Sequence, residues 1–107
     1  MQWCELIGRE PMITVNTGNG TPEEAADWIE YLTGSSSTKY GKLRSKNGRS
    51  KPYELKTIFI GNEMFGGWQI GHTDAKTYAL KYDRFVKAIK KVNNNLRFIA
   101  VGACADH

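Results

Sequence analysis

The residues best suited to chemistry lie in the middle of the chain, where Asn62 and Glu63 directly follow the apolar segment 57–61. That segment has the composition of a buried strand, and parallel α/β folds place their working groups at the carboxyl ends of strands. A carboxyl group at such an edge is reachable but partly shielded from water, so it can hold a proton near neutrality. Glu63 could therefore protonate a leaving oxygen as a general acid, while the Asn62 amide could bond a sugar hydroxyl.

A structural role for Glu63 explains its position equally well, because a carboxylate after a strand can cap the next segment or form an ion pair. The loop that follows contains Gly66, Gly67 and Trp68, and an indole face can stack on a sugar ring. His72 lies in the same loop and could touch a substrate, although a single histidine is more often a hydrogen-bonded structural residue. Residue types alone leave both interpretations open.

The surrounding pattern predicts alternating strands and helices that would hold these residues in place. Thr21, Pro22 and Glu24 form the signature of a helix start, with an N-cap, a proline at the first position and a reciprocal carboxylate. A second helix is expected to begin at Thr73 or Asp74, with its apolar residues at spacings of three and four. The elements expected are a helix end over 3–8, a strand over 11–16, a helix to 33, a polar connection over 35–52 with a short helical turn at 40–43, a strand over 57–61, a helix to 92 and a strand over 97–101.

This order predicts an α/β fold with parallel strands joined by crossover helices. The strands are continuous apolar runs, which is typical of a sheet that is covered on both faces. Three parallel strands with two uncovered edges would make a poor free-standing domain. We therefore expect residues 1–107 to be a segment of a larger α/β domain, without internal repeats or a domain boundary.

Composition and charge exclude several classes of protein. The chain has 107 residues, 40% hydrophobic and 24% charged, which is typical of a globular protein rather than a disordered one. A net charge of +4 permits an acidic partner but does not require one. No apolar run reaches the roughly 20 residues of a membrane span, and the first residues do not resemble a signal peptide. Cys4 and Cys104 show no metal-ligand spacing and are interpreted as small buried residues in a reduced, cytoplasmic setting.

Four segments together resemble the family 51 α-L-arabinofuranosidases, which are retaining glycoside hydrolases built on a (β/α)8 barrel. They are residues 10–16, residues 20–31, Gly-Asn-Glu-Met over 61–64, and Trp-Gln-Ile-Gly-His over 68–72. A lone Asn-Glu pair is a weak signal, but the pair within these two motifs is specific. The similarity extends from Trp3 to about Gly102, and it implies that residues 1–107 are a partial catalytic barrel domain, from the end of its second helix through its fifth strand.

The resemblance also implies a function for the two polar residues after the second strand. Glu63 matches the family's acid/base, and Asn62 matches the asparagine that hydrogen-bonds the sugar at the cleavage point. The expected reaction is hydrolysis of terminal α-L-arabinofuranosyl residues in oligo- and polysaccharides by double displacement. The family's nucleophile is a Glu on the seventh strand, which this sequence lacks, so the isolated chain is expected to be inactive. No cofactor or metal, no membrane, a cytoplasmic location and a homo-oligomeric full-length protein are the further expectations.

A small basic α/β module that binds nucleic acid is the alternative from a different class. Its candidate surface is the run Lys39, Lys42, Arg44, Lys46, Arg49 and Lys51. A solvated basic connection is the simpler interpretation, because these charges need no partner. Gly18, Asn19 and Gly20 also suggest a dinucleotide-binding loop, but Glu23 stands where the third glycine would be needed, so a structural turn is expected.

Overall fold

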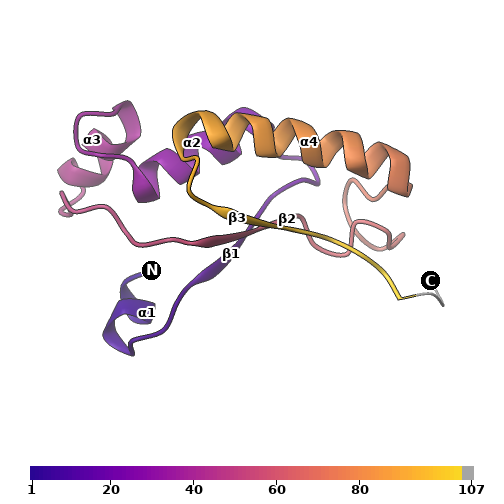
Figure 1. Cartoon of the computed structure of the whole chain (residues 1–107), viewed down its shortest axis with the longest axis horizontal. Helices are drawn as coiled ribbons and strands as arrows, with labels where there is room; N and C mark the ends of the chain where they lie inside the picture. The colour runs from indigo at the N-terminus through magenta and orange to yellow at the C-terminus, as the bar shows by residue number, and fades with distance from the viewer. Residues whose placement is uncertain (105–107) are drawn as a thin grey trace.

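A computed structural model describes residues 1–104 of the chain. Helices and strands alternate along most of it, as the sequence pattern predicts. The elements in chain order are α1 (Gln2–Leu6), β1 (Met12–Val15), α2 (Pro22–Thr33), α3 (Lys39–Lys46), β2 (Thr57–Ile60), α4 (Ala75–Val92) and β3 (Arg97–Ala100). Figure 1 shows α2, α3 and α4 together above the strands, with α1 on the other side.

The three strands form a parallel sheet in the order β1-β2-β3. Ile58 in β2 is level with Ile13 in β1 and with Phe98 in β3, and Ile60 is level with Val15 and Ala100. Because all three strands run the same way, the segments that follow them emerge at one edge of the sheet. The loop with Asn62 and Glu63 is therefore on the same edge as the loop after β1.

The helix starts have the caps that the sequence predicts. The Thr21 hydroxyl accepts the Glu24 N–H at 3.1 Å, while the Glu24 carboxylate accepts the Thr21 N–H at 2.9 Å. At α4 the cap is Asp74, whose carboxylate accepts the Thr77 N–H at 2.9 Å. The bonds to the Glu24 and Thr77 N–H groups satisfy orphan donors of the first turns of α2 and α4. The Thr77 backbone and side chain, by donating to the Asp74 carboxylate, hold the pKa of that carboxyl below its usual value.

The core lies between the sheet and the α2–α4 layer, on one face of the sheet only. Its buried residues include Val15, Ile29, Ile58, Ile60 and Ile89. The opposite face is uncovered: Met12 is 63% exposed, Thr14 is exposed, and Phe59 and Ile99 are only partly buried. The helices of the described residues thus cover one face only, and the expected cover of the second face is not supplied by residues 1–104.

The connection between α2 and β2 contains more structure than the sequence predicts. A turn was expected at 40–43, whereas α3 extends over Lys39–Lys46, with the Thr38 hydroxyl accepting the Gly41 N–H. Arg44 on this helix is only 1% exposed, so the expectation of a fully solvated basic run is wrong at this position. Its guanidinium donates to the carbonyl oxygens of Tyr31, Gly34, Arg49 and Ser50 at 2.6–3.1 Å. These bonds replace the water that the buried charge has lost.

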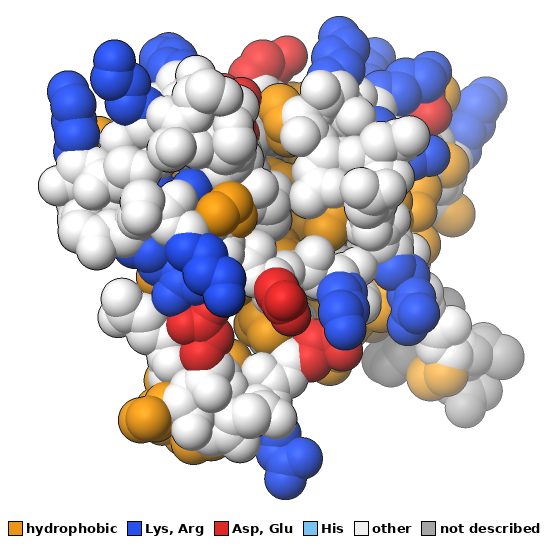
Figure 2. All heavy atoms as spheres, turned by 60° about the vertical axis from the view of Figure 1, so that its left-hand side comes forward, with side chains coloured by type: hydrophobic (Ala, Val, Ile, Leu, Met, Phe, Trp, Pro, Cys, Tyr) orange, Lys and Arg blue, Asp and Glu red, His pale blue; other side chains and the backbone are white. Residues whose placement is uncertain are grey.

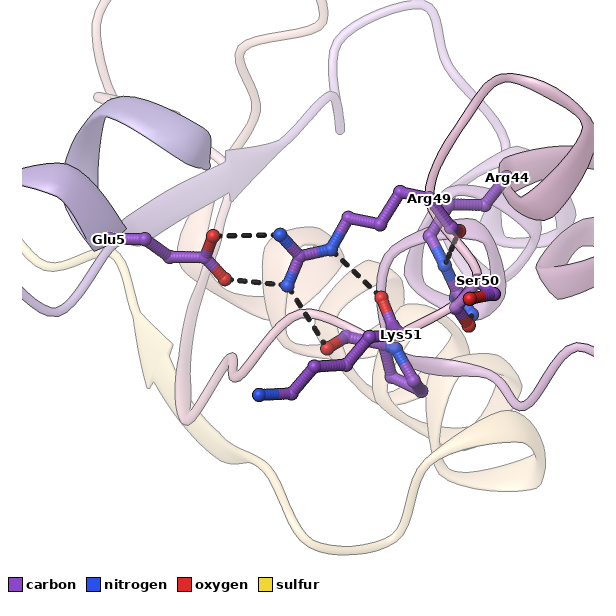
Figure 3. Close-up of polar contacts among 6 residues, drawn as sticks. Glu5, Arg44, Arg49, Ser50 and Lys51 are labelled. Carbon is purple, nitrogen blue, oxygen red and sulfur yellow. Dashed lines mark hydrogen bonds and ion pairs between the residues drawn. The ribbon is translucent and has the colours of Figure 1, made fainter.

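Arg49 extends this network to the first helix. Its guanidinium makes two bonds of 2.7 Å with the Glu5 carboxylate and lies 3.8 Å from the centre of the Tyr53 ring. Figure 3 shows the pair, together with the bond from the Arg44 side chain to the Arg49 backbone. The bidentate pair lowers the pKa of the Glu5 carboxyl. Arg44 thus positions the backbone of Arg49, and the Arg49 side chain in turn holds Glu5 of α1.

Basic and acidic side chains are mixed on the surface. Figure 2 shows Lys and Arg spread over one side of the molecule, with Asp and Glu among them. Cys104 is exposed and Cys4 is partly buried, so the interpretation of both as buried residues is wrong; both are free thiols. Within residues 1–104, no helix combines the length and apolar character needed to cross a membrane.

Candidate active site

Glu63 lies where the sequence places it, three residues beyond the end of β2, and its side chain is exposed. Its backbone has a φ of +46°, and it is the only non-glycine residue with a positive φ in the described chain. This left-handed conformation is disfavoured for residues with a Cβ and is concentrated at functional sites. Gly61, with a φ of +85°, begins the same sharp turn.

Within residues 1–104, the Glu63 carboxylate has one side-chain hydrogen-bond partner. The indole Nε1–H of Trp68 donates to Oε2 of Glu63 at 2.7 Å. The indole ring lies over Gly66, where a Cβ would overlap it, and it makes an edge-to-face contact with Phe65 at a centroid distance of 6.2 Å. Sequence reasoning named only the ability of the indole face to stack on a sugar and missed this bond, since the residue spacing does not show where an indole N–H points.

Asn62 and Asn16 line a common hollow of about 260 Å³ at the carboxyl ends of β1 and β2. Both side chains are exposed. The side-chain Oδ1 of Asn16 accepts the Gly18 N–H at 3.0 Å, and its Nδ2 donates to Oδ1 of Asn19 at 2.8 Å. The hollow therefore presents side-chain amides, one of them on the residue before Glu63, and such groups suit a ligand with several hydroxyl groups.

The loops after β1 and β2 are fixed to each other by close backbone contact. A Cβ on Gly71 would lie 2.5 Å from the Gly18 oxygen, and a Cβ on Gly18 would lie 2.6 Å from the Ile70 oxygen. Lys81 of α4 joins both loops, donating to the Thr17 oxygen at 2.8 Å and to the Gly71 oxygen at 3.3 Å. The expected structural turn over 18–20 is confirmed, and its glycines serve loop packing.

Replacing Gly71 by Ala should destabilise this loop pair. The residue has a φ of +73°, and the new methyl group would meet backbone atoms that cannot move aside easily. We expect a loss of about 1–3 kcal/mol, measured as a lower thermal midpoint of the full-length protein. Gly67→Ala is the matched control, because nothing lies within 4 Å of its Cβ position and its φ is not positive. Equal midpoints for the two variants would contradict the contact.

Tyr78 of α4 joins the ends of β2 and β3. Its hydroxyl donates to the Ile60 oxygen at 2.6 Å and accepts the Val101 N–H at 2.9 Å. Burial raises the pKa of this hydroxyl, and the Val101 N–H opposes that effect. The bridge holds the last residue of β2 in place, two residues before Asn62.

His72 has the structural character that sequence reasoning favoured. Its Nδ1 lies 2.8 Å from the Gln69 carbonyl oxygen, within the loop itself. Across residues 1–104, no three His, Cys, Asp or Glu side chains are grouped so as to hold a metal ion. The chemistry that this edge can offer is that of one accessible carboxyl group beside amides and an indole.

Comparison with known proteins identifies a family for this chain. Residues 1–107 match the family model described as "Alpha-L-arabinofuranosidase 1 domain". The chain is 44% identical over 102 residues to "Probable alpha-L-arabinofuranosidase C" of Aspergillus clavatus, which covers 95% of the chain and 20% of that protein. It is 35% identical to the "Intracellular exo-alpha-(1->5)-L-arabinofuranosidase" of Bifidobacterium longum, covering 95% of the chain and 18% of the relative.

Two solved structures have the same fold over this region. They are the arabinose complex of an α-L-arabinofuranosidase from Thermotoga maritima and a thermostable GH51 α-L-arabinofuranosidase from Thermotoga petrophila. Each superposes with a TM-score of 0.92 at 42% identity, covering 97% of the chain and 22% of the solved structure. The chain thus spans about a fifth of the length of the proteins that it matches.

Proposed function

Because the chain belongs to the family 51 α-L-arabinofuranosidases, we propose that the full-length protein hydrolyses terminal α-L-arabinofuranosyl residues and that Glu63 is its acid/base. The observation that carries the proposal is the Glu63 backbone. A non-glycine residue holds a φ of +46° at the carboxyl end of a parallel strand, with its side chain exposed. A carboxylate that merely capped the next segment or paired with a cation would not need this conformation, and no ion pair of Glu63 is found within residues 1–104.

In this proposal the reaction has two steps. First, a carboxylate from a part of the protein outside this chain attacks the anomeric carbon, and the electron pair of the breaking C–O bond goes to the leaving oxygen. The proton of the Glu63 carboxyl neutralises that oxygen. Then Glu63, now ionised, takes a proton from water, the water oxygen bonds to the anomeric carbon, and the nucleophile departs. Asn62 would hold a hydroxyl of the bound sugar from the edge of the hollow.

The uncovered face of the sheet supports a place for residues 1–107 within a (β/α)8 barrel, as part of its catalytic domain. In such barrels the helices lie outside, and the inner face carries large side chains that interlock with those of other strands. Here the helix layer is on one face, whereas Phe59 and Ile99 project from the other. Arabinose-containing oligosaccharides would then approach at the carboxyl edge, where both Asn16 and Glu63 lie.

The proposal extends to the setting of the full-length protein. We expect a cytoplasmic homo-oligomer that acts on oligosaccharide substrates, as the name of the Bifidobacterium relative supports for location. The nucleic-acid alternative has less support, since Arg44 is buried in carbonyl contacts and Arg49 is paired with Glu5. Two of the six cations in the candidate surface are therefore already engaged within the protein.

The direct test is to assay the full-length protein with 4-nitrophenyl α-L-arabinofuranoside and with arabinosyl oligosaccharides. Nuclear magnetic resonance of the first product should show arabinose with the anomeric configuration of the substrate, as double displacement requires. The matched substrate control is the corresponding β-D-xylopyranoside, which should be hydrolysed far more slowly. Product with inverted configuration would contradict the mechanism, and no release of arabinose would contradict the function.

A further inference from the structure

We propose that Trp68 is a positioning residue for Glu63: its indole N–H holds Oε2 of the carboxyl group, so that the proton used in the reaction resides on Oε1. The inference rests on the proposed role of Glu63 and adds a division of labour between the two carboxyl oxygens. It also gives Phe65 and Gly66 a structural role, because both residues contact the indole ring of Trp68 and set its position.

The geometry that carries the inference is a short bond with a well-held donor. Trp68 Nε1 lies 2.7 Å from Oε2 of Glu63, which is short for an N–H donor. Trp68 is 66% exposed, so the position of its indole ring depends on two local features rather than on burial. First, Gly66 has no side chain, so the indole ring can lie directly over its backbone. Second, the Phe65 ring contacts the indole ring edge-to-face, at an interplanar angle of 88°.

The chemistry follows from the fact that an indole nitrogen can only donate. A carboxylate or carbonyl oxygen accepts an N–H more strongly than a hydroxyl oxygen does. With Oε2 engaged by Trp68, the protonated carboxyl group is more stable with its hydrogen on Oε1. Oε1 is then the oxygen that gives the proton to the leaving group and later takes one from water. The carboxyl group is also kept from rotating, which preserves its alignment between the two steps.

The test compares leaving groups, because proton donation matters only when the leaving oxygen is basic. In the full-length protein, Trp68→Phe keeps an aromatic ring and removes the N–H. We expect kcat/KM to fall about tenfold or more for arabinosyl oligosaccharides, whose leaving group needs the proton. In 2,4-dinitrophenyl α-L-arabinofuranoside the leaving group is dinitrophenolate, which departs without being protonated. For this substrate the change in kcat/KM should be less than about twofold.

A second variant separates orientation from the loss of the ring. Gly66→Ala retains Trp68 but places a methyl group where the indole lies, so the N–H must move away from Glu63. It should show the same dependence on leaving group as Trp68→Phe. Trp3→Phe is the matched control: this tryptophan is 69% exposed on α1, far along the molecule from the loop after β2. Its kinetics should be those of the parent.

The outcomes separate this inference from the proposed function. If Glu63→Gln removes activity on oligosaccharides while Trp68→Phe slows both substrates equally, or slows neither, Trp68 does not position the acid and the inference fails alone. If Glu63→Gln retains activity on oligosaccharides, the role of Glu63 fails, and the inference fails with it.

Discussion

Replacing Glu63 by Gln should reduce kcat/KM on arabinosyl oligosaccharides about 10³-fold in the full-length protein, the largest effect expected for any substitution in this chain. Gln has nearly the same shape and still accepts the Trp68 N–H, so the loop should keep its conformation. It has no proton to give to a leaving oxygen, and general acid catalysis contributes about 10²–10⁴-fold. The measurement is steady-state kinetics with an oligosaccharide and with a dinitrophenyl glycoside, whose first step should be little affected.

A smaller side chain at the same position gives the complementary result. Glu63→Ala leaves space beside the anomeric carbon, so added azide should attack the glycosyl-enzyme without a base and restore turnover of the dinitrophenyl substrate.

Glu10→Gln is the matched control for Glu63→Gln, because Glu10 is also exposed and lies before β1, at the opposite edge of the sheet. Activity on oligosaccharides within about tenfold of the parent in Glu63→Gln would assign the acid/base to another residue.

Arg44→Met should be the most destabilising substitution outside the site. The side chain is 1% exposed and satisfies four carbonyl oxygens, two of them near the carboxyl end of α2. Methionine can fill the volume but leaves these acceptors without donors, at a cost of about 3 kcal/mol or more. Because α3 depends on these bonds, amide hydrogen exchange of α3 in the full-length protein should accelerate about 100-fold.

The control for this experiment lies on the same helix. Lys42→Met makes the same change from cation to methionine at an exposed position, where substitutions alter stability by at most about 0.5 kcal/mol. Arg44→Lys keeps the charge but cannot donate in four directions, so an intermediate exchange rate is expected. Equal exchange rates in Arg44→Met and Lys42→Met would show that the buried guanidinium does not stabilise α3.

Sequence reasoning predicts the alternating elements well, because their signals are local. The helix starts at Thr21 and Asp74 are specified by capping motifs that span only four consecutive residues. Short apolar runs specify the strands of the parallel sheet in the same local way. The same locality places Glu63 at the end of β2. The role of Glu63 as an acid/base stays a prediction, since it depends on a partner carboxylate and a substrate rather than on the position alone.

The features that sequence reasoning missed all depend on contacts across the fold. Arg44 reads as one more cation in a polar run, and only the surrounding carbonyl groups of α2 and the 49–50 segment explain its burial. Apolar runs predict that both faces of the sheet are covered but do not say which part of the protein covers each face, so they could not show that residues 1–104 leave the second face without a helix. Cys104 was similarly misjudged, since burial preferences of a residue type do not apply to an exposed segment after a strand.

In the proposed role of Glu63 as acid/base, its left-handed backbone would exchange folding stability for catalysis at this single position. Holding a residue with a Cβ there costs about 1 kcal/mol that glycine would not lose. A sequence freed from selection for hydrolysis would gain robustness by adopting glycine, at the expense of the carboxyl group. Relatives of this domain that have lost activity should therefore often carry glycine at position 63. Restoring glutamate there would lower the folding stability again.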